Sequence, residues 1–171
     1  MINDLDARTL ERSLPAIPTL LPYFDPTGKY GWSEKDILVE TASRNYTAND
    51  YQVLMQDANF TLGYQMREDA ESALGNLGPP EVEIVCAHGS DLKTVASIRY
   101  ENGQNLPNGK PVTLEGDGDD TVNLLSLNAC QKFKDLQPQN FTYKVFPFEA
   151  HGGMLKTKKF LDYFKTYLEN L

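Results

Sequence analysis

The chain has 171 residues, of which 40% are hydrophobic, and it carries a formal net charge of −8 at pH 7. This length and apolar share are enough for one globular domain, or part of one, with a hydrophobic core. The acidic balance excludes a nucleic-acid partner, because phosphate binding requires clustered Lys and Arg. No stretch approaches the roughly 18 to 20 apolar residues of a membrane-spanning helix, and the N-terminal segment lacks the pattern of a signal peptide.

Two features of the sequence predict a secretory route. Asn45, Asn59 and Asn140 each begin an Asn-x-Thr sequon, and Cys86 and Cys130 form an even cysteine set that allows one disulfide. The alternative interpretation is ordinary surface asparagines and buried thiols. Because a secretory protein needs a leader and this chain has none, we expect the chain to begin inside a longer parent sequence.

The N-terminal residues 1–35 are predicted to form an irregular segment, since four prolines between residues 13 and 30 interrupt any helix. The segment carries more apolar side chains than a free linker, and we expect them to cover an apolar surface. They are Leu14, Ile17, Leu20, Leu21, Tyr23 and Phe24. Residues 36–171 form the second predicted part, which begins with a short strand over 36–41.

Two amphipathic helices are expected next. The first begins at residues 47–50, whose sequence Thr-Ala-Asn-Asp resembles a capping box, and ends near Asn59. The second covers 62–74. We interpret the apolar stripes of both helices as core packing. A β-branched strand over 81–86 then leads into the segment Ala-His-Gly-Ser at 87–90.

The second half of the chain alternates predicted strands and helices. Two Asn-Gly pairs within residues 98–110 indicate a hairpin-like pair of tight turns. Strand, helix, strand and helix then follow over residues 112–114, 121–134, 143–148 and 153–171. This alternation predicts parallel α/β organisation.

An acidic run of four carboxylates lies at residues 115–122, with the sequence Glu-Gly-Asp-Gly-Asp-Asp-Thr-Val. A calcium loop is one interpretation, since Asp117, Asp119 and Thr121 alternate like EF-hand ligands. However, Asn128 stands where that loop requires a bidentate Glu, and the central Gly is missing. The other interpretation is the acid of a hydrolase triad, which lies on a turn after a strand and orients a histidine.

His151 is the candidate partner of that acid. It follows the last predicted strand, and Gly152 and Gly153 allow the backbone to turn tightly beside its imidazole. Acid and base would then lie at successive strand ends, where open α/β sheets place their sites. Solvent-exposed loop charges and a capping histidine are the alternative.

A longer pattern resembles the C-terminal signature of the lecithin:cholesterol acyltransferase and lysosomal phospholipase A family. The pattern is the run at 116–122, with Cys130 eleven residues after Asp119 and His151 thirty-two after it. The similarity extends back to the Leu-Leu-Pro-Tyr at residues 20–23 and so covers nearly the whole chain. The resemblance implies the C-terminal part of an α/β-hydrolase fold, with a mainly parallel sheet and flanking helices.

The resemblance also implies roles for particular residues. Asp119 would be the triad acid, His151 the general base, and Cys86 and Cys130 a disulfide. The implied activity is acyl transfer from a phospholipid or other acyl lipid, through a Ser ester, to water or a lipid alcohol. It implies no cofactor and no metal, possible contact with a membrane or lipoprotein surface, and a lysosomal, vacuolar or extracellular location for the parent protein.

The nucleophile of such a triad is missing from this sequence. The sequence contains no Gly-x-Ser-x-Gly elbow: Ser33 follows Gly31-Trp32 but is followed by Glu34-Lys35, and Ser90 lacks both flanking glycines. His88 stands where the family commonly has an aromatic residue, and we interpret it as a loop residue beside the site. We therefore expect the chain to be inactive alone. The alternative is a non-catalytic, truncated relative that binds lipid or a partner.

Overall fold

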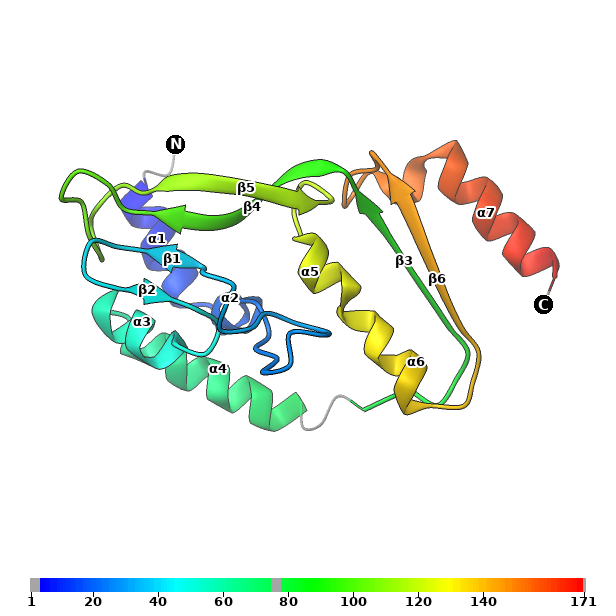
Figure 1. Ribbon diagram of the computed structural model, residues 1–171, viewed down its shortest axis with the longest axis horizontal. Coiled ribbons are helices and arrows are strands. Elements are labelled where there is room, and N and C mark those ends of the chain that lie inside the picture. The colour runs from blue at the N-terminus through cyan, green and yellow to red at the C-terminus, as the bar shows by residue number, and fades with distance from the viewer. Residues whose placement is uncertain (1–3, 75–77, 171) are drawn as a thin grey trace. The chain divides into compact units, whose positions relative to one another are not determined.

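The structure, a computed structural model, describes residues 4–74 and 78–170 and mixes helices with strands (Figure 1). The chain divides into two compact units, which are treated separately. The first unit takes residues up to 28, then 32–77 and 99–112, and the second takes 29–31, 78–98 and 113–171. The chain passes between the units several times.

The first unit contains four helices and two short strands among its described residues. They are α1 (Asp4–Arg12), α2 (Ala16–Thr19), β1 (Val39–Glu40), β2 (Asn45–Tyr46), α3 (Tyr51–Asp57) and α4 (Thr61–Leu74). β1 and β2 pair in antiparallel fashion, with Val39 opposite Tyr46. The side chains of Tyr46, Tyr51 and Met55 are buried in the core of this unit.

The N-terminal segment corrects two expectations. Helices α1 and α2 lie within residues 1–35, where irregular structure was predicted. Pro18 fits α2 because it lies in the first turn, where its missing N–H would have no helical partner. The apolar side chains expected to cover a surface are instead largely exposed, since Leu20 is 80% and Tyr23 67% accessible to solvent.

Helix α3 begins later than predicted. The backbone N–H and the hydroxyl of Thr47 both donate to the Asp50 carboxylate, each at 2.8 Å. The carboxylate therefore closes the turn before the helix, and the helix begins at Tyr51. Helix α4 covers Thr61–Leu74, close to the predicted range of 62–74. Its buried side chains differ from the predicted stripe, since Arg67 is buried and Leu62 is 54% exposed.

The second unit contains the elements of the second half of the chain, together with most of β4 and β5. They are β3 (Ile84–Ser90), β4 (Leu92–Arg99), β5 (Val112–Gly118), α5 (Leu124–Leu127), η1 (Asn128–Gln131), α6 (Lys132–Leu136), β6 (Phe141–Pro147), η2 (Met154–Lys156) and α7 (Lys158–Glu169). The predicted helix over 121–134 is thus three short consecutive pieces, and β4 was not predicted. The predicted final helix is divided at Thr157, whose hydroxyl caps α7 by accepting from the Phe160 N–H at 3.3 Å.

Strand pairing follows two patterns. β3 and β6 form a parallel pair, from Ile84 opposite Phe141 to Ser90 opposite Pro147. The other sheet has the order β2-β1-β4-β5. The expected parallel organisation is therefore found in β3 and β6, whereas β1 and β2 are antiparallel. Because parallel strands end at the same sheet edge, the segments after β3 and β6 emerge side by side (Figure 1).

The β3–β6 pair is fastened to its surroundings in two ways. A disulfide joins Cys86 in β3 to Cys130 in η1, with the two Cα atoms 6.4 Å apart. Phe146 of β6 is fully buried, with ring centroids of Phe160 and Tyr163 from α7 at 5.5 and 5.6 Å. The end of β6 is therefore held between its neighbouring strand and the last helix.

We predict that replacing both Cys86 and Cys130 with Ala lowers the free energy of unfolding. The bond closes a loop of 44 residues, and the chain-entropy model gives about 4 kcal/mol for a loop of this length. Urea unfolding of the oxidised wild type and the double variant measures the difference. Wild type reduced with dithiothreitol is the control and should resemble the variant; equal stability of all three samples would contradict the prediction.

Candidate active site

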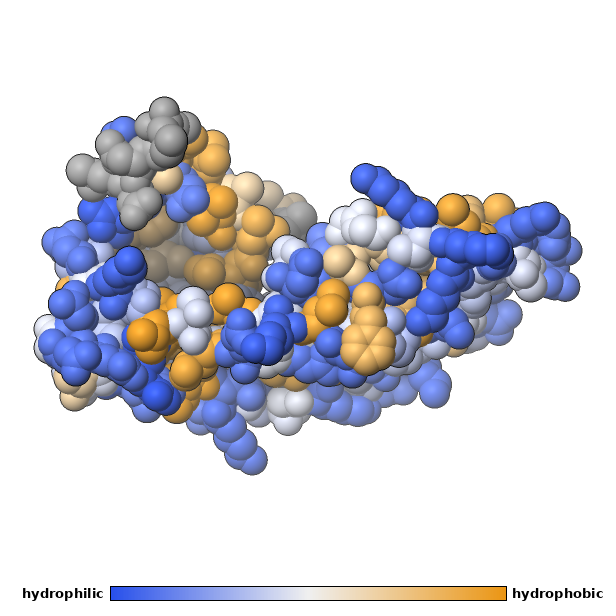
Figure 2. All heavy atoms as spheres, turned by 90° about the horizontal axis from the view of Figure 1, so that it is seen from above, coloured by the Kyte–Doolittle hydropathy of each residue, from blue (hydrophilic) through white to orange (hydrophobic). Residues whose placement is uncertain are grey.

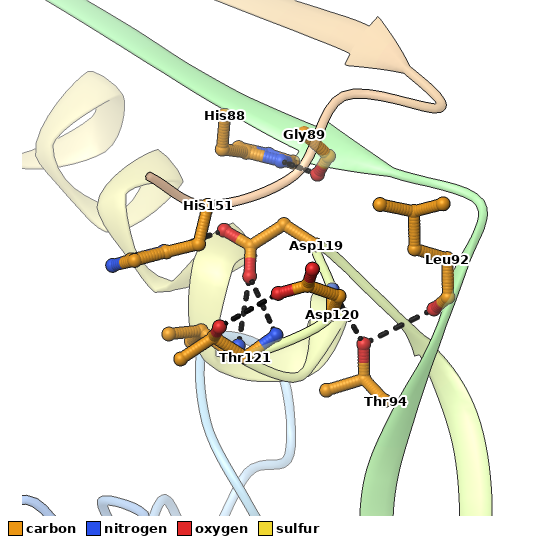
Figure 3. Close-up of polar contacts among 9 residues, drawn as sticks. His88, Gly89, Leu92, Thr94, Asp119, Asp120, Thr121 and His151 are labelled. Carbon is orange, nitrogen blue, oxygen red and sulfur yellow. Dashed lines mark hydrogen bonds and ion pairs between the residues drawn. The ribbon is translucent and has the colours of Figure 1, made fainter. Parts of the chain in front are cut away.

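The structure brings Asp119 and His151 into direct contact. Asp119 follows β5 and His151 follows β6. The His151 Nδ1 lies 2.8 Å from Asp119 Oδ2, and the His151 backbone N–H donates to the Asp119 carbonyl oxygen at 2.8 Å (Figure 3). The two residues are thus joined by a side-chain and a main-chain hydrogen bond, which fixes the orientation of the imidazole.

The Asp119 carboxylate is buried and held by its own turn. Its side chain is 3% exposed, and Oδ1 accepts from the N–H groups of Val122 at 2.8 Å and Thr121 at 3.3 Å. Burial alone would raise the pKa of this carboxyl. The hydrogen bonds from Val122, His151 and Thr121 together outweigh burial and lower the pKa below its ordinary value. Asp119 is therefore a carboxylate at neutral pH and can hold the proton of its histidine on Nδ1.

The turn that carries Asp119 depends on two further residues. Asp120 has a φ of +74°, and its N–H donates to the Thr94 hydroxyl at 3.0 Å. The same hydroxyl donates to the Leu92 carbonyl oxygen at 3.0 Å, and Thr94 is 2% exposed (Figure 3). A Cβ at Gly118 would lie 2.3 Å from the Val122 carbonyl oxygen, so no larger residue fits there.

Gly89 allows the histidine segment to approach the acid. A Cβ at this position would lie 1.9 Å from the Glu149 carbonyl oxygen and 3.1 Å from the Asp119 Cβ. The segment before His151 therefore packs directly against the backbone of β3. The sequence alone shows a glycine after His88 but gives no sign of this contact.

The far side of the His151 ring is open. The side chain is 52% exposed, and within residues 4–74 and 78–170 no hydrogen bond to Nε2 is found. With its proton held on Nδ1 by Asp119, the neutral ring presents an unprotonated Nε2. That nitrogen can accept a proton from a hydroxyl within hydrogen-bond distance.

The hydroxyls of the two serines considered as nucleophiles each donate to a neighbouring carboxylate. The Ser90 hydroxyl donates to the Asp91 carboxylate and the Ser33 hydroxyl to the Asp36 carboxylate, each at 2.7 Å. Among the described residues, Asp119 and His151 are thus in contact, but neither candidate serine is hydrogen-bonded to His151.

His88 does not lie in a loop, which corrects its interpretation from sequence. It lies within β3, because that strand begins and ends later than predicted, and it is 4% exposed. Its Nδ1 donates to the Gly89 carbonyl oxygen at 2.7 Å, and its Nε2 lies 2.8 Å from the Tyr143 hydroxyl. Tyr143 in turn donates to the Asn128 side chain. His88 therefore connects β3 to β6 and η1, and its hydrogen bonds go to Gly89 and Tyr143.

The remaining candidate residues lie as follows. The Asp117 carboxylate accepts from the Asp91 N–H at 2.7 Å, and the Thr121 hydroxyl donates to Asp120. No group of three or more His, Cys, Asp or Glu side chains suited to a metal ion occurs in the described residues. The three sequon asparagines, Asn45, Asn59 and Asn140, are all exposed.

Phe148 is strained and exposed beside this site. It follows β6, its N–H donates to the Ser90 carbonyl oxygen at 2.8 Å, and its φ is +64°. This left-handed conformation disfavours a residue with a Cβ. The side chain is nevertheless 74% exposed. Its packing within the described structure therefore does not compensate the backbone strain.

The first prediction from this site concerns pH. Because the pKa of Asp119 is lower in the folded chain than in the unfolded one, its ionised form stabilises the fold above the ordinary value of 3.8. That stabilisation is lost as the pH falls through the lower folded value. We expect urea unfolding to show a steeper acid loss of stability in wild type than in Asp119→Asn. Asp120→Asn, the exposed neighbour, should retain the wild-type dependence; a wild-type slope in Asp119→Asn would refute the assignment.

The second prediction concerns Phe148. Replacement by Gly should raise the free energy of unfolding by about 1 kcal/mol, because glycine adopts a positive φ without the Cβ clash. Chemical denaturation measures the change. Phe148→Ala removes the same ring and keeps the Cβ, so it should gain less than Phe148→Gly. Equal effects of the two variants would show that backbone strain is not the cause.

Comparison with known proteins identifies relatives over nearly the whole chain. A family model described as lecithin:cholesterol acyltransferase matches residues 1–156. The lysosomal phospholipase A and acyltransferase of Bos taurus is 34% identical over 168 residues, which are 98% of this chain and 39% of that protein. The protein of the same name from Homo sapiens gives the same identity and coverage.

A second group of relatives is similar over a shorter region. The phosphatidylcholine-sterol acyltransferase of Gallus gallus is 37% identical over 122 residues, 71% of this chain and 29% of that protein. The chain thus spans less than half the length of these relatives. Since the family model covers residues 1–156 of the 171, the chain belongs to the lecithin:cholesterol acyltransferase family.

Proposed function

We propose that this chain supplies the acid and the general base of a Ser-Asp-His triad in a lipid acyltransferase or phospholipase. The observation that carries the proposal is the 2.8 Å hydrogen bond between Asp119 and His151, with Nε2 of the histidine open on the other side. The buried, hydrogen-bonded carboxylate and the exposed imidazole are the arrangement that proton transfer to and from a serine requires. The family membership supports acyl transfer as the reaction.

The proposed reaction uses His151 twice. A serine hydroxyl that is hydrogen-bonded to Nε2 gives its proton to the ring as its oxygen attacks the acyl carbonyl of a phospholipid. The ring then returns the proton to the departing alcohol, and the acyl group remains on the serine as an ester. In a second step water or a lipid alcohol gives its proton to His151 and attacks the ester carbonyl; the bond to serine breaks, and the ring returns the proton to the serine oxygen. Asp119 orients the ring and stabilises its charged form throughout.

We assign the parallel strands β3 and β6 to the C-terminal part of an α/β-hydrolase fold. In such folds the acid and the histidine follow successive late strands, and the nucleophile lies on an elbow earlier in the chain. Asp119 and His151 match the later positions, and no Gly-x-Ser-x-Gly occurs in the 171 residues. We therefore propose that residues outside this sequence supply the serine and the oxyanion donors, and that this chain alone is inactive.

The proposed setting is the secretory pathway, with lipid at a membrane or lipoprotein surface as substrate. The exposed sequon asparagines are accessible for glycosylation, and a disulfide persists in oxidising compartments. Figure 2 shows hydrophobic side chains reaching the surface among hydrophilic ones; the most exposed include Leu20, Tyr23, Val82, Phe148 and Leu155. No helix in the described residues is long and apolar enough to span a membrane.

We predict that joining this chain to the nucleophile-bearing N-terminal part of the Bos taurus relative gives acyl release from phosphatidylcholine vesicles. In that protein Asp119→Asn should lower kcat by about 10⁴-fold and His151→Ala by a similar factor, because each disables the base. Release of labelled fatty acid measures the rate. Asp120→Asn is the matched control, since the Asp120 carboxylate accepts from the Thr121 hydroxyl whereas His151 bonds to Asp119, and it should retain most of the activity.

Three results would change the proposal. Turnover by this chain alone that disappears in Asp119→Asn would overturn its inactivity. Turnover of the joined protein that survives His151→Ala would overturn the role of the histidine. A correctly folded joined protein that binds vesicles but releases no fatty acid would instead support the non-catalytic alternative, a lipid- or partner-binding relative.

A further inference from the structure

The first unit contains a cavity of about 240 Å³ that includes neither Asp119 nor His151. It lies between the segment after α2, the start of α3 and one face of α4. Four aromatic residues line it, namely Tyr23, Phe24, Tyr51 and Tyr64. The polar side chains in its wall are Asn49, Gln52, Arg67 and Glu71.

Arg67 forms a rigid part of the cavity wall. Its side chain is 8% exposed, its Nη1 donates to the carbonyl oxygens of Pro18 at 2.9 Å and Leu21 at 3.2 Å, and its Nη2 pairs with Glu71 at 2.7 Å. The guanidinium also stacks over the Tyr51 ring at 4.6 Å. Arg67 is therefore fixed from several directions, and its charge is balanced by Glu71.

This charge arrangement selects against ionic ligands. A cation in the cavity would meet the Arg67 guanidinium, which already occupies the face of Tyr51. An anion would meet the Glu71 carboxylate, whose side chain is 52% exposed. Desolvating a charged ligand beside either group without a free opposite charge is costly. The balanced pair therefore favours a neutral ligand.

The other wall residues favour a ligand with hydroxyl groups. The side chains of Asn49 and Gln52 are exposed and form no hydrogen bond within the described residues. Each amide offers two donor hydrogens and an acceptor oxygen. Tyr23, 67% exposed, adds an accessible aromatic ring to the same wall. A sugar ring has hydroxyl groups at its edge and an apolar face of C–H groups. The amides can bind the hydroxyl groups, and an aromatic ring can cover the apolar face.

We infer that this cavity is a binding site for a neutral sugar ring, either a free monosaccharide or the end of a glycan. The exposed Tyr23 ring covers the apolar face of the sugar, and Asn49 and Gln52 bind its hydroxyl groups. Arg67 keeps the wall in place through Pro18 and Leu21 and does not need to contact the ligand. The site is independent of the acyl transfer proposed above, so the failure of either proposal leaves the other unaffected.

Trp32 provides a direct measurement of binding. It is the single tryptophan of the chain and is 6% exposed. Its backbone N–H donates to the Tyr23 carbonyl oxygen at 3.0 Å, and its backbone carbonyl oxygen accepts from the Asp25 backbone N–H at 2.8 Å. Ordering of the Tyr23 wall by a ligand should therefore change the fluorescence of Trp32.

The experiment titrates the purified chain with methyl glycosides of glucose, galactose, mannose and N-acetylglucosamine, and with choline and inorganic phosphate. We expect saturable binding of at least one glycoside and none of choline or phosphate. Gln52→Ala and Tyr23→Ala should each weaken that binding at least tenfold. Gln56→Ala, an exposed glutamine one turn further along α3 and outside the cavity wall, is the matched control and should bind like wild type.

Each other outcome overturns the inference. Saturable binding of choline or phosphate in place of a glycoside would show a site for charged ligands. Absence of saturation with all four glycosides would remove the site. Equal effects of Gln52→Ala and Gln56→Ala, in variants whose circular dichroism matches wild type, would place the sugar elsewhere on the chain. A chitobiose titration beside the monosaccharide series distinguishes a glycan end, which should bind more tightly, from a free sugar.

Discussion

The hydrogen bond between Asp119 and His151 imposes a demanding constraint on the second unit. It joins segments 32 residues apart in sequence at a distance of 2.8 Å. Such a distance requires the segments after β5 and β6 to converge, which limits the side chains allowed between them. Gly89 is the clearest consequence, since even a methyl group there would collide with the Glu149 carbonyl oxygen. The parallel register of β3 and β6 sets that approach.

Burial of the acid imposes a second constraint, which falls on the backbone. A carboxylate that is 3% exposed is stable only when its oxygens are hydrogen-bonded. The turn from Asp119 to Val122 supplies two N–H groups, and this turn needs a left-handed Asp120 and a glycine at 118. Thr94 then fixes the Asp120 N–H from a neighbouring strand. The acidic run in the sequence is therefore a turn built around a single buried carboxylate.

The pairing of Asp119 with His151 could be anticipated because the family resemblance fixes their spacing in sequence, and the structure brings the two side chains to 2.8 Å. The family resemblance likewise implied the cysteine pair. Thr94 could not be found in this way, because it lies 25 residues before the acid and belongs to a strand without a clear apolar alternation. His88 was misplaced for a related reason: β3 was predicted to end at residue 86, but it ends four residues later at Ser90, so His88 lies in the buried strand and not in a loop. Contacts across strands depend on register, which local patterns do not determine.

The exposed apolar residues also differ from what the local sequence predicted. The Leu and Tyr side chains after α1 were expected to cover a surface, since apolar composition alone suggests burial. Leu20, 80% exposed, and the strained Phe148, 74% exposed, show that an apolar side chain can instead lie at the surface, as it does where proteins contact lipid or a partner. The contact between Asp119 and His151 is different, because both residues belong to the second unit. Local composition therefore does not determine which apolar side chains are buried. The orientation of His151, in contrast, depends on its hydrogen bonds to Asp119 and on the turn from Asp119 to Val122.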